Sequence, residues 1–376
     1  MKLSDRSQRI EGSKTARFIP LLKRMKREGR SVISLAIGEP EFDTPAAVIE
    51  ATKQALDHQQ TRYSAIAGLD DLRAALAARF EGCTVENVAV FNGAKQALYT
   101  IFQTICDPGD EVIIPVPCWV SFPEQVRMAG GEPVFVATRG HQLDVDAVAA
   151  AAGGRTRAIL INSPNNPTGA VYPRQDLERI ARLAAERDLF IVADHAYDFF
   201  VYDGRTCPSL YDVAAVRDRL IVTRSFSKQY AMTGFRVGYT VAPTAVTAAM
   251  IRLQSHVSGN VCTFAQHGAL AALAMDDALL VRRRSELRRK RDLAFDRVAE
   301  LFPCIRPQGA FYLFPDISGH LAQHEGSGAF ALRLLETAGV AVVPGADFGM
   351  EGHVRICYAA PEALLQEAFN RIREVL

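Results

Sequence analysis

Lys228 is the residue of this sequence that is best placed for covalent chemistry with a carbonyl compound. It ends the segment Arg224-Ser225-Phe226-Ser227-Lys228, which follows the apolar run Leu220–Thr223. Burial and neighbouring cations lower the pKa of such an amine, and its neutral form is a nucleophile. The commoner alternative is a loop lysine whose ammonium reaches solvent. Arg236, eight residues further along, could bind a phosphate, because a guanidinium can donate two parallel hydrogen bonds.

A carboxylate and two amides follow two other apolar runs. Asp194 comes directly after Leu189–Ala193, with Tyr197 three residues beyond it, and the segment Ser163–Gly169 (SPNNPTG) follows Arg157–Asn162. A buried carboxylate needs a cation, which could be a structural lysine or arginine or a protonated nitrogen of a cofactor ring. The two asparagines would donate hydrogen bonds to a ligand oxygen or, equally well, form a turn.

A turn of small residues follows the apolar run Val88–Phe91. The turn, Asn92-Gly93-Ala94-Lys95, leads into a helical pattern, and N–H groups at a helix N-terminus attract phosphate. It lacks the GxGxxG of dinucleotide sites and the GKS/T of a P-loop, and alone it is a common strand-to-helix turn. Together, however, these segments offer a phosphate cradle, an anion for a ring nitrogen, donors for a ring oxygen and a lysine for an aldehyde. Those four demands belong to one ligand, pyridoxal phosphate.

Short apolar runs alternate with longer amphipathic stretches, which predicts an α/β fold with a mostly parallel seven-stranded sheet flanked by helices. In such sheets ligands bind beyond the carboxyl ends of the strands, where the residues above lie. The expected strands are Val88–Phe91, Glu111–Val116, Pro133–Ala137, Arg157–Asn162, Leu189–Ala193, Leu220–Thr223 and Val237–Val241. Helices are expected at Lys95–Cys106, Phe122–Ala129 and Arg174–Arg187.

After about Val281 the pattern changes to that of a smaller α+β unit. A long charged helix precedes a strand at Phe311–Phe314, a helix at Gly328–Ala338, strands at Val340–Val343 and Val354–Tyr358, and a terminal helix. The first forty or so residues are helical and charged until Gly38-Glu39-Pro40, and we expect them to join this unit. The 376 residues suit two domains. We expect an N-terminal arm with part of the small domain (1–45), a large cofactor-binding domain (46–280) and a small C-terminal domain (281–376).

Composition argues against several classes of function. Lys plus Arg (43) balances Asp plus Glu (42), so no overall field favours nucleic acid, and we interpret the basic clusters Arg282–Arg284 and Arg288–Arg291 as the solvent-facing side of a helix. Seven scattered cysteines without a CxxC pair argue against disulfides or a zinc cluster and fit a reducing compartment. Met1–Ile10 lacks the apolar core of a signal peptide, and no apolar run is long enough to span a membrane. We expect a cytoplasmic protein without a metal.

In this order the segments resemble the class I/II aminotransferases, pyridoxal-phosphate enzymes of fold type I, and most closely the bacterial aspartate and aromatic aminotransferase-like subgroup. The resemblance extends over nearly the whole chain, from Leu35 to Ala359. Its most specific parts are Asn165–Gly169 (NNPTG), Asp194–Tyr197, and Ser225–Lys228 with Arg236.

The resemblance implies a role for each candidate residue toward the cofactor. Lys228 would bind pyridoxal phosphate as an imine. Trp119 would stack on the pyridine ring, although a lone tryptophan is more commonly part of a core. Asp194 would pair with the ring nitrogen, and Asn166 and Tyr197 would donate to the ring 3-oxygen. The phosphate would be bound by Gly93, Ala94, Lys95, Ser225 and Arg236.

The resemblance also implies a substrate site and a partner. Arg355 would bind the α-carboxylate of the amino acid with help from the backbone at Gly38, and Trp119 and Asn166 would line the same pocket. Tyr63, in the segment Arg62–Gly68, matches a tyrosine that reaches the phosphate of the neighbouring subunit, so a homodimer with shared active sites is expected. The implied reaction moves the amino group of an L-α-amino acid to a 2-oxo acid in two half-reactions, with the freed Lys228 amine as general acid and base.

Three departures from the family pattern concern substrate choice and packing. His195 stands where the motif usually has glutamate after the aspartate. Gln266 stands where some aspartate-specific members have a second arginine, and Glu11 stands where members that accept prephenate or aspartate have a lysine. Both of the latter changes remove positive charge, so we expect a broad or neutral donor preference unless Arg17, Lys14 or Lys95 supplies a cation.

Two alternatives to transamination remain at this point. A decarboxylase, a carbon–sulfur lyase or an oxidase of the same fold would use the same cofactor motifs, because the cofactor supplies the chemistry in all of them. A cofactor-sensing regulator would need an attached DNA-binding domain, for which the family match leaves no room.

Overall fold

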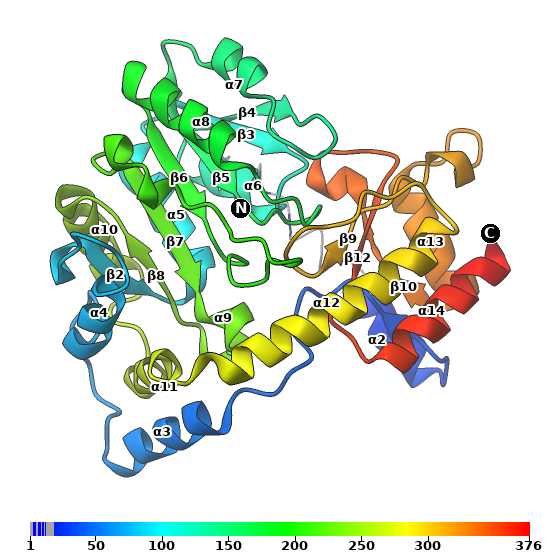
Figure 1. Cartoon of the computed structure of the whole chain (residues 1–376), viewed down its shortest axis with the longest axis horizontal. Coiled ribbons are helices and arrows are strands. Elements are labelled where there is room, and N and C mark those ends of the chain that lie inside the picture. Colours follow the sequence, from blue (N-terminus) through cyan, green and yellow to red (C-terminus); the bar gives the residue numbers. More distant parts are fainter. Residues whose placement is uncertain (1–2, 5–6, 9, 11, 13–18) are drawn as a thin grey trace.

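A seven-stranded sheet forms the centre of the larger part of the molecule (Figure 1). The structure is a computed structural model that describes residues 3–4, 7–8, 10, 12 and 19–376. The strand order is β2-β8-β7-β6-β5-β3-β4, and all neighbours are parallel except β8, which runs antiparallel to β7 and β2. The strands are β2 (Val88–Phe91), β3 (Glu111–Val116), β4 (Glu132–Ala137), β5 (Thr156–Asn162), β6 (Phe190–Asp194), β7 (Leu220–Ser225) and β8 (Gly238–Val241). All seven predicted strands are confirmed to within two residues at each end.

Both faces of this sheet are covered, which is why its strands read as continuous apolar runs. Side chains alternate between the faces, so Ile159 and Ile161 of β5 pack into one core while Ala158 and Leu160 pack into the other. The first core is completed by α4 (Asp70–Ala77), α7 (Val145–Ala151), α8 (Arg174–Glu186) and α11 (Thr263–Leu273). The second core is completed by α5 (Gly93–Ile105), α6 (Ser121–Met128) and α10 (Thr244–Val257). The three predicted helices are thus α5, α6 and α8.

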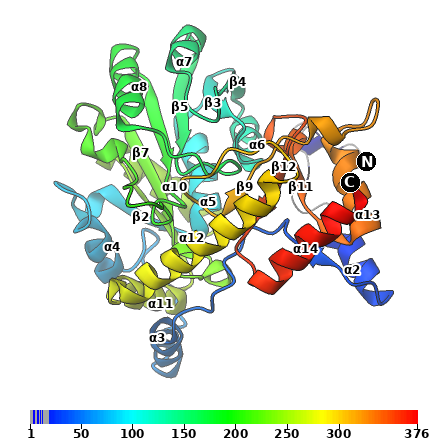
Figure 2. The same ribbon diagram turned by 45° about the vertical axis from the view of Figure 1, so that its right-hand side comes forward.

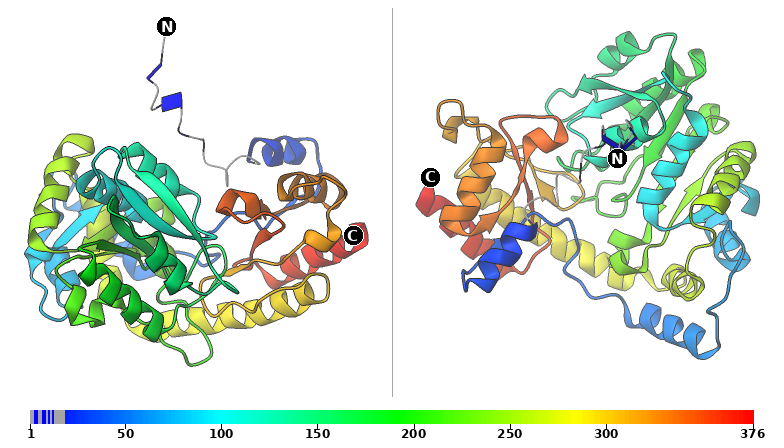
Figure 3. Two further views of the ribbon diagram at one scale, coloured as in Figure 1. Left: turned by 90° about the horizontal axis from the view of Figure 1, so that it is seen from above. Right: turned by 180° about the vertical axis from the view of Figure 1, so that it is seen from behind.

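A smaller unit with its own core lies beside the first (Figures 2 and 3). Its antiparallel sheet has the order β11-β12-β9, and β1 pairs in parallel with β10, so the N-terminal segment joins the C-terminal part of the chain as expected. The elements are α2 (Ile19–Arg27), β1 (Ile33–Ser34), β9 (Tyr312–Leu313), α13 (Ser327–Ala338), β10 (Val340–Ala341), β11 (Val343–Pro344), β12 (Val354–Cys357) and α14 (Glu362–Val375). The domain boundaries after residues 45 and 280 stay a prediction.

The long charged helix α12 (Asp277–Ala299), yellow in Figures 1 and 2, runs between the two units. Its structure corrects the interpretation that its basic clusters form a solvent-facing side. Instead of facing solvent together, Arg283, Lys290 and Arg291 are buried. Arg291 is only 1% exposed and binds both carboxylate oxygens of Asp203 at 2.7 and 2.9 Å.

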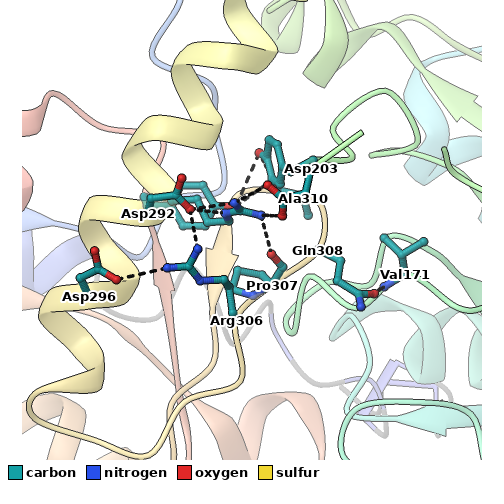
Figure 4. Close-up of polar contacts among 11 residues, drawn as sticks. Val171, Asp203, Asp292, Asp296, Arg306, Pro307, Gln308 and Ala310 are labelled. Carbon is teal, nitrogen blue, oxygen red and sulfur yellow. Dashed lines mark hydrogen bonds and ion pairs between the residues drawn. The ribbon is translucent and has the colours of Figure 1, made fainter. Parts of the chain in front are cut away.

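Two of these three buried cations of α12 are paired with carboxylates, whereas Arg283 donates to the backbone carbonyl oxygen of Asp43. Lys290 forms ion pairs with Glu41 and, at 3.1 Å, with Glu286. Arg306 extends the network by binding Asp292 and Asp296 on the outer side of the helix, each at 3.2 Å (Figure 4). Pairing with carboxylates offsets the cost of burying Lys290 and Arg291 at positions of this helix where apolar residues would usually pack.

Two absences within the described residues concern membranes and metals. No helix there is long and apolar enough to cross a membrane. No group of three or more His, Cys, Asp or Glu residues in those ranges is arranged to hold a metal ion.

Candidate active site

The Lys228 side chain is partly buried at the carboxyl edge of the large sheet. Strand β7 ends at Ser225, whose hydroxyl accepts the N–H of Ser227 at 3.1 Å and starts the short helix α9 (Phe226–Gln229). From this helix the Lys228 Nζ donates to the carbonyl oxygen of Gly38 at 2.6 Å. Burial, with a smaller contribution from the positive charges of Arg355 and Arg236, lowers the pKa of Lys228 to about 8. The amine can therefore become neutral close to physiological pH, as a nucleophile or a base requires.

Asp194 is a buried carboxylate at the end of the neighbouring strand β6. Its Oδ1 accepts the N–H of Ala196 at 3.0 Å, and no cationic side chain in the described part of the chain is paired with it. Burial, with a smaller contribution from the negative charge of Asp198, raises the pKa of Asp194 to about 7. A cation placed beside this carboxylate would stabilise its ionised form. A protonated ring nitrogen fits that requirement.

Arg355 of β12 crosses from the small unit to the large one. It donates through Nη1 to Asn166 Oδ1 at 3.0 Å and through Nη2 to the Ala36 carbonyl oxygen at 2.6 Å. Its guanidinium is thus fixed, while its buried Nε has no protein partner among the described residues. Because Asn166 uses its oxygen for Arg355, its amide N–H groups remain for a ligand oxygen.

The phosphate end of the predicted site is built around Arg236. Strand β8 is antiparallel, so its amino end, preceded by Arg236, lies at the same edge as the carboxyl ends of β7 and β2. A Cβ at Gly93, which has φ +81°, would come within 2.4 Å of the Arg236 guanidinium, and one at Gly238 within 2.4 Å of the Ala94 nitrogen. Only glycine lets the guanidinium and the first turn of α5 approach this closely.

Lys95 borders a cavity of about 690 Å³ next to Arg236. The Lys95 ammonium lies 5.0 Å from the centre of the Trp119 ring, and burial together with the charge of Arg236 lowers the pKa of Lys95. Such a volume would accommodate a sizeable side chain, and neither Lys228 nor Arg355 is among the residues that line it. Besides Lys95 and Arg236, the lining includes Tyr99, Cys118, Met128, Phe135, Asp347 and Phe348.

Most of the predicted site residues lie together at this edge, linked by the contacts above. Tyr63 does not contact them: its side chain is 98% exposed at the surface. The structure corrects the expectation that Gln266 lies in the pocket for the substrate side chain. Gln266 is completely buried, and its amide binds the backbone at Leu69 and Val261, each at 2.8 Å. It cannot contact a substrate side chain. Glu11, like Lys14 and Arg17, lies outside the described residues.

His195, the departure next to Asp194, is a buried neutral residue. Burial lowers its pKa to about 4, and the positive charge of Arg224 acts in the same direction. Arg224 itself pairs with Asp198 at 2.9 Å. The imidazole therefore occupies space behind the site without adding a charge to it.

Tyr312 is a residue of the site that the sequence analysis missed. Its hydroxyl lies 2.7 Å from that of Tyr197, and its ring centre lies 4.5 Å from the guanidinium carbon of Arg355. The sequence marked Phe311–Phe314 only as a strand. Nothing in the local pattern could reveal a contact between residues more than a hundred positions apart.

The sequence and the fold are similar to those of known proteins. The profile of the family "Aminotransferase class I and II" matches residues 30–372. The "Aspartate/prephenate aminotransferase" of Thermus thermophilus is 41% identical, with 100% of this chain and 98% of the relative covered. The "Probable aspartate/prephenate aminotransferase" of Aquifex aeolicus is 39% identical with the same coverage. The solved structure of the Thermus thermophilus aspartate aminotransferase with maleate has a TM-score of 0.95 at 40% identity, covering 100% of both chains.

Proposed function

Because the chain belongs to the class I and II aminotransferases, and so moves amino groups between an L-α-amino acid and a 2-oxo acid with pyridoxal 5′-phosphate, we propose that Lys228 is its cofactor-binding and catalytic lysine. The observation that carries this assignment is the contact of its Nζ with the Gly38 carbonyl oxygen at 2.6 Å inside the site, where partial burial lowers the pKa to about 8. An amine of lowered pKa can both bind the cofactor aldehyde and accept a proton from the substrate Cα.

The residues around Lys228 fit the cofactor. Asp194 supplies a buried carboxylate without a cationic partner in the described ranges, which suits the protonated ring nitrogen. Asn166 has amide hydrogens left for the ring oxygen, and the hydroxyl of the buried Tyr197, which lies 2.7 Å from that of Tyr312, would also donate to it. At the other end, Arg236 lies against the first turn of α5, where the backbone N–H groups of Gly93, Ala94 and Lys95 would receive the phosphate together with Ser225. When bound, the cofactor withdraws electrons from the Cα–H bond of the amino acid.

We assign the substrate α-carboxylate to Arg355. Its guanidinium is held by Asn166 and Ala36 before any substrate arrives, so little ordering is needed on binding. A carboxylate bound there fixes Cα relative to Lys228, and this orientation decides which bond of the substrate is broken. Gly38 contributes its backbone carbonyl, which holds the Lys228 amine.

We further propose that Lys95 lets the enzyme accept an acidic donor such as aspartate. The expectation of a neutral preference rested on Gln266 and Glu11, and the first of these lies outside the pocket. Lys95 instead supplies a cation at the cavity wall, where it could pair with the carboxylate of an acidic side chain. The names of the relatives from Thermus thermophilus and Aquifex aeolicus agree with such a donor. The cavity of about 690 Å³ leaves room for larger side chains as well.

We also propose a homodimer in which Tyr63 completes the phosphate site of the second subunit. A tyrosine with 98% of its side chain exposed buries no apolar area within its own subunit, so an intersubunit role accounts for its position. All seven cysteines are free, which is compatible with the reducing cytoplasm that we propose as its location.

Two measurements test the proposed function. Reduction of the holoenzyme with borohydride followed by peptide mapping should place the cofactor on Lys228, and a label on any other lysine would contradict the assignment. Incubation of the holoenzyme with single amino acids should convert the bound aldehyde to the amine form, most readily with aspartate if the role of Lys95 is correct. For the Lys95→Met variant in the second measurement, Lys26→Met, which changes a surface lysine, serves as the matched control.

A further inference from the structure

Tyr312 contacts three parts of the site at once although it belongs to the small unit. It lies on β9 and pairs in register with Cys357 of β12, two residues beyond Arg355. Its side chain is almost completely buried. A buried tyrosine needs a partner for its hydroxyl, so the position of that partner is informative.

The ring of Tyr312 supports the guanidinium of Arg355. The guanidinium carbon lies 4.5 Å from the centre of this ring and 5.0 Å from that of Phe348. A desolvated cation over an aromatic face is stabilised and held in its plane. The ring therefore fixes the direction from which Arg355 meets a carboxylate.

The hydroxyl of Tyr312 bonds to the hydroxyl of Tyr197 at 2.7 Å. Burial raises the pKa of both tyrosines, so both stay neutral and one must donate to the other. If Tyr197 donates to the cofactor, then Tyr312 must donate to Tyr197, because each hydroxyl has a single hydrogen. A hydroxyl that accepts a hydrogen bond becomes a stronger donor itself.

The backbone at Gly38 leaves space for this hydroxyl. A Cβ at position 38 would lie 2.1 Å from the Tyr312 oxygen, so glycine is required there. The carbonyl of the same residue holds the Lys228 amine. Tyr312 is thus packed against the segment that positions the lysine.

We propose that Tyr312 is a positioning residue that holds Arg355 with its ring and strengthens donation by Tyr197 with its hydroxyl. Carboxylate binding and the charge on the cofactor ring oxygen then depend on one side chain of the small unit. The inference rests on the roles proposed above for Arg355 and Tyr197.

The two functions of Tyr312 can be separated by Tyr312→Phe and Tyr312→Leu in the holoenzyme. Tyr312→Phe keeps the ring, so the Kd for maleate, which binds without reacting because it has no amino group, should change less than about twofold. Tyr312→Phe removes the hydroxyl that donates to Tyr197, so Tyr197 donates more weakly to the cofactor ring oxygen. The negative charge on that oxygen is then less stabilised, and the cofactor stays protonated to a higher pH. The pH midpoint of the cofactor absorbance should rise by about 0.5 unit. Tyr312→Leu should show this rise and also bind maleate about tenfold more weakly.

Two controls separate these effects from general damage. In a Tyr197→Phe background, adding Tyr312→Phe should leave the midpoint unchanged, because the coupled donor is already gone. Tyr358→Phe removes another buried hydroxyl, bonded to the Ala310 carbonyl at 3.0 Å, and should alter neither readout. An unchanged midpoint in Tyr312→Phe, or wild-type maleate affinity in Tyr312→Leu, would overturn the proposal. Failure of the proposed function would instead be seen in the wild-type enzyme, as a cofactor bound to a different lysine.

Discussion

Replacing Arg355 by alanine should lower kcat/KM for all α-amino acids by a similar factor. The side chain is buried, and two of its nitrogens are already bound to Asn166 and Ala36, so its guanidinium is aimed at the group that all substrates share. Removing one partner of a buried, hydrogen-bonded ion pair costs about 2–5 kcal/mol. The expected loss is therefore roughly thirtyfold to several thousandfold. Arg355→Lys should fall between wild type and Arg355→Ala, since lysine keeps the charge but loses the paired geometry.

The assay compares kcat/KM for aspartate, alanine and phenylalanine at saturating cofactor, after thermal unfolding has shown that the variant is folded. The stability check matters because alanine leaves two buried oxygens without their donor, at about 1–3 kcal/mol each. Arg371→Ala, which changes a small-unit arginine bound to Ser31, controls for the loss of an arginine away from the site. A large decrease with one substrate and none with the others would refute the assignment of Arg355 to the α-carboxylate.

Three further predictions concern the lysines and the partner subunit. Because only the neutral Lys228 amine attacks an aldehyde, and its pKa is lowered to about 8, cofactor uptake by the apoprotein should accelerate tenfold per pH unit below that value and level off above it. A rate still rising at pH of about 10, the range of an ordinary lysine, would contradict the lowered pKa. Because Lys95 is exposed, Lys95→Met should reduce kcat/KM for aspartate by about fivefold or less and for alanine by less still, and an equal loss for both would remove Lys95 from side-chain recognition. Mixing Lys228→Ala with Tyr63→Phe subunits should restore activity, and mixtures no more active than the separate variants would argue against shared sites.

The large sheet and the main cofactor residues were predictable because local pattern and function coincide there. A strand buried on both faces is a short apolar run, and the polar residue that ends it must lie at the sheet edge. Asp194, Asn166 and Lys228 each follow such a run, so their convergence followed from the parallel arrangement alone. The reversed strand β8 shows the limit of this argument, since Arg236 reaches the same edge from an amino end.

The errors arose where a residue's environment depends on distant parts of the chain. Arg291 was placed on a solvent-facing helix side, but Asp203 lies nearly ninety positions away and the fold brings the two together. Gln266 was placed in the pocket by alignment, whereas its amide binds the backbone at Leu69. Tyr312 carried no local indication of its contact with Tyr197. In each case the deciding partner is brought close only by packing between distant segments.

The segment between β1 and α3 (Ala46–Asp57) links the two cations of the site. Its Ala36 carbonyl binds the Arg355 guanidinium, and its Gly38 carbonyl binds the Lys228 amine. The same segment is anchored in the small unit, since Leu35 bonds with Ala341 and with Cys357 at 2.9 and 2.8 Å. Directions alternate along an extended backbone, so groups two residues apart, such as the carbonyls of positions 36 and 38, face the same side. The distance between the carboxylate-binding group and the catalytic amine is therefore set by two backbone oxygens only two residues apart, and a shift of this segment would move both cations together.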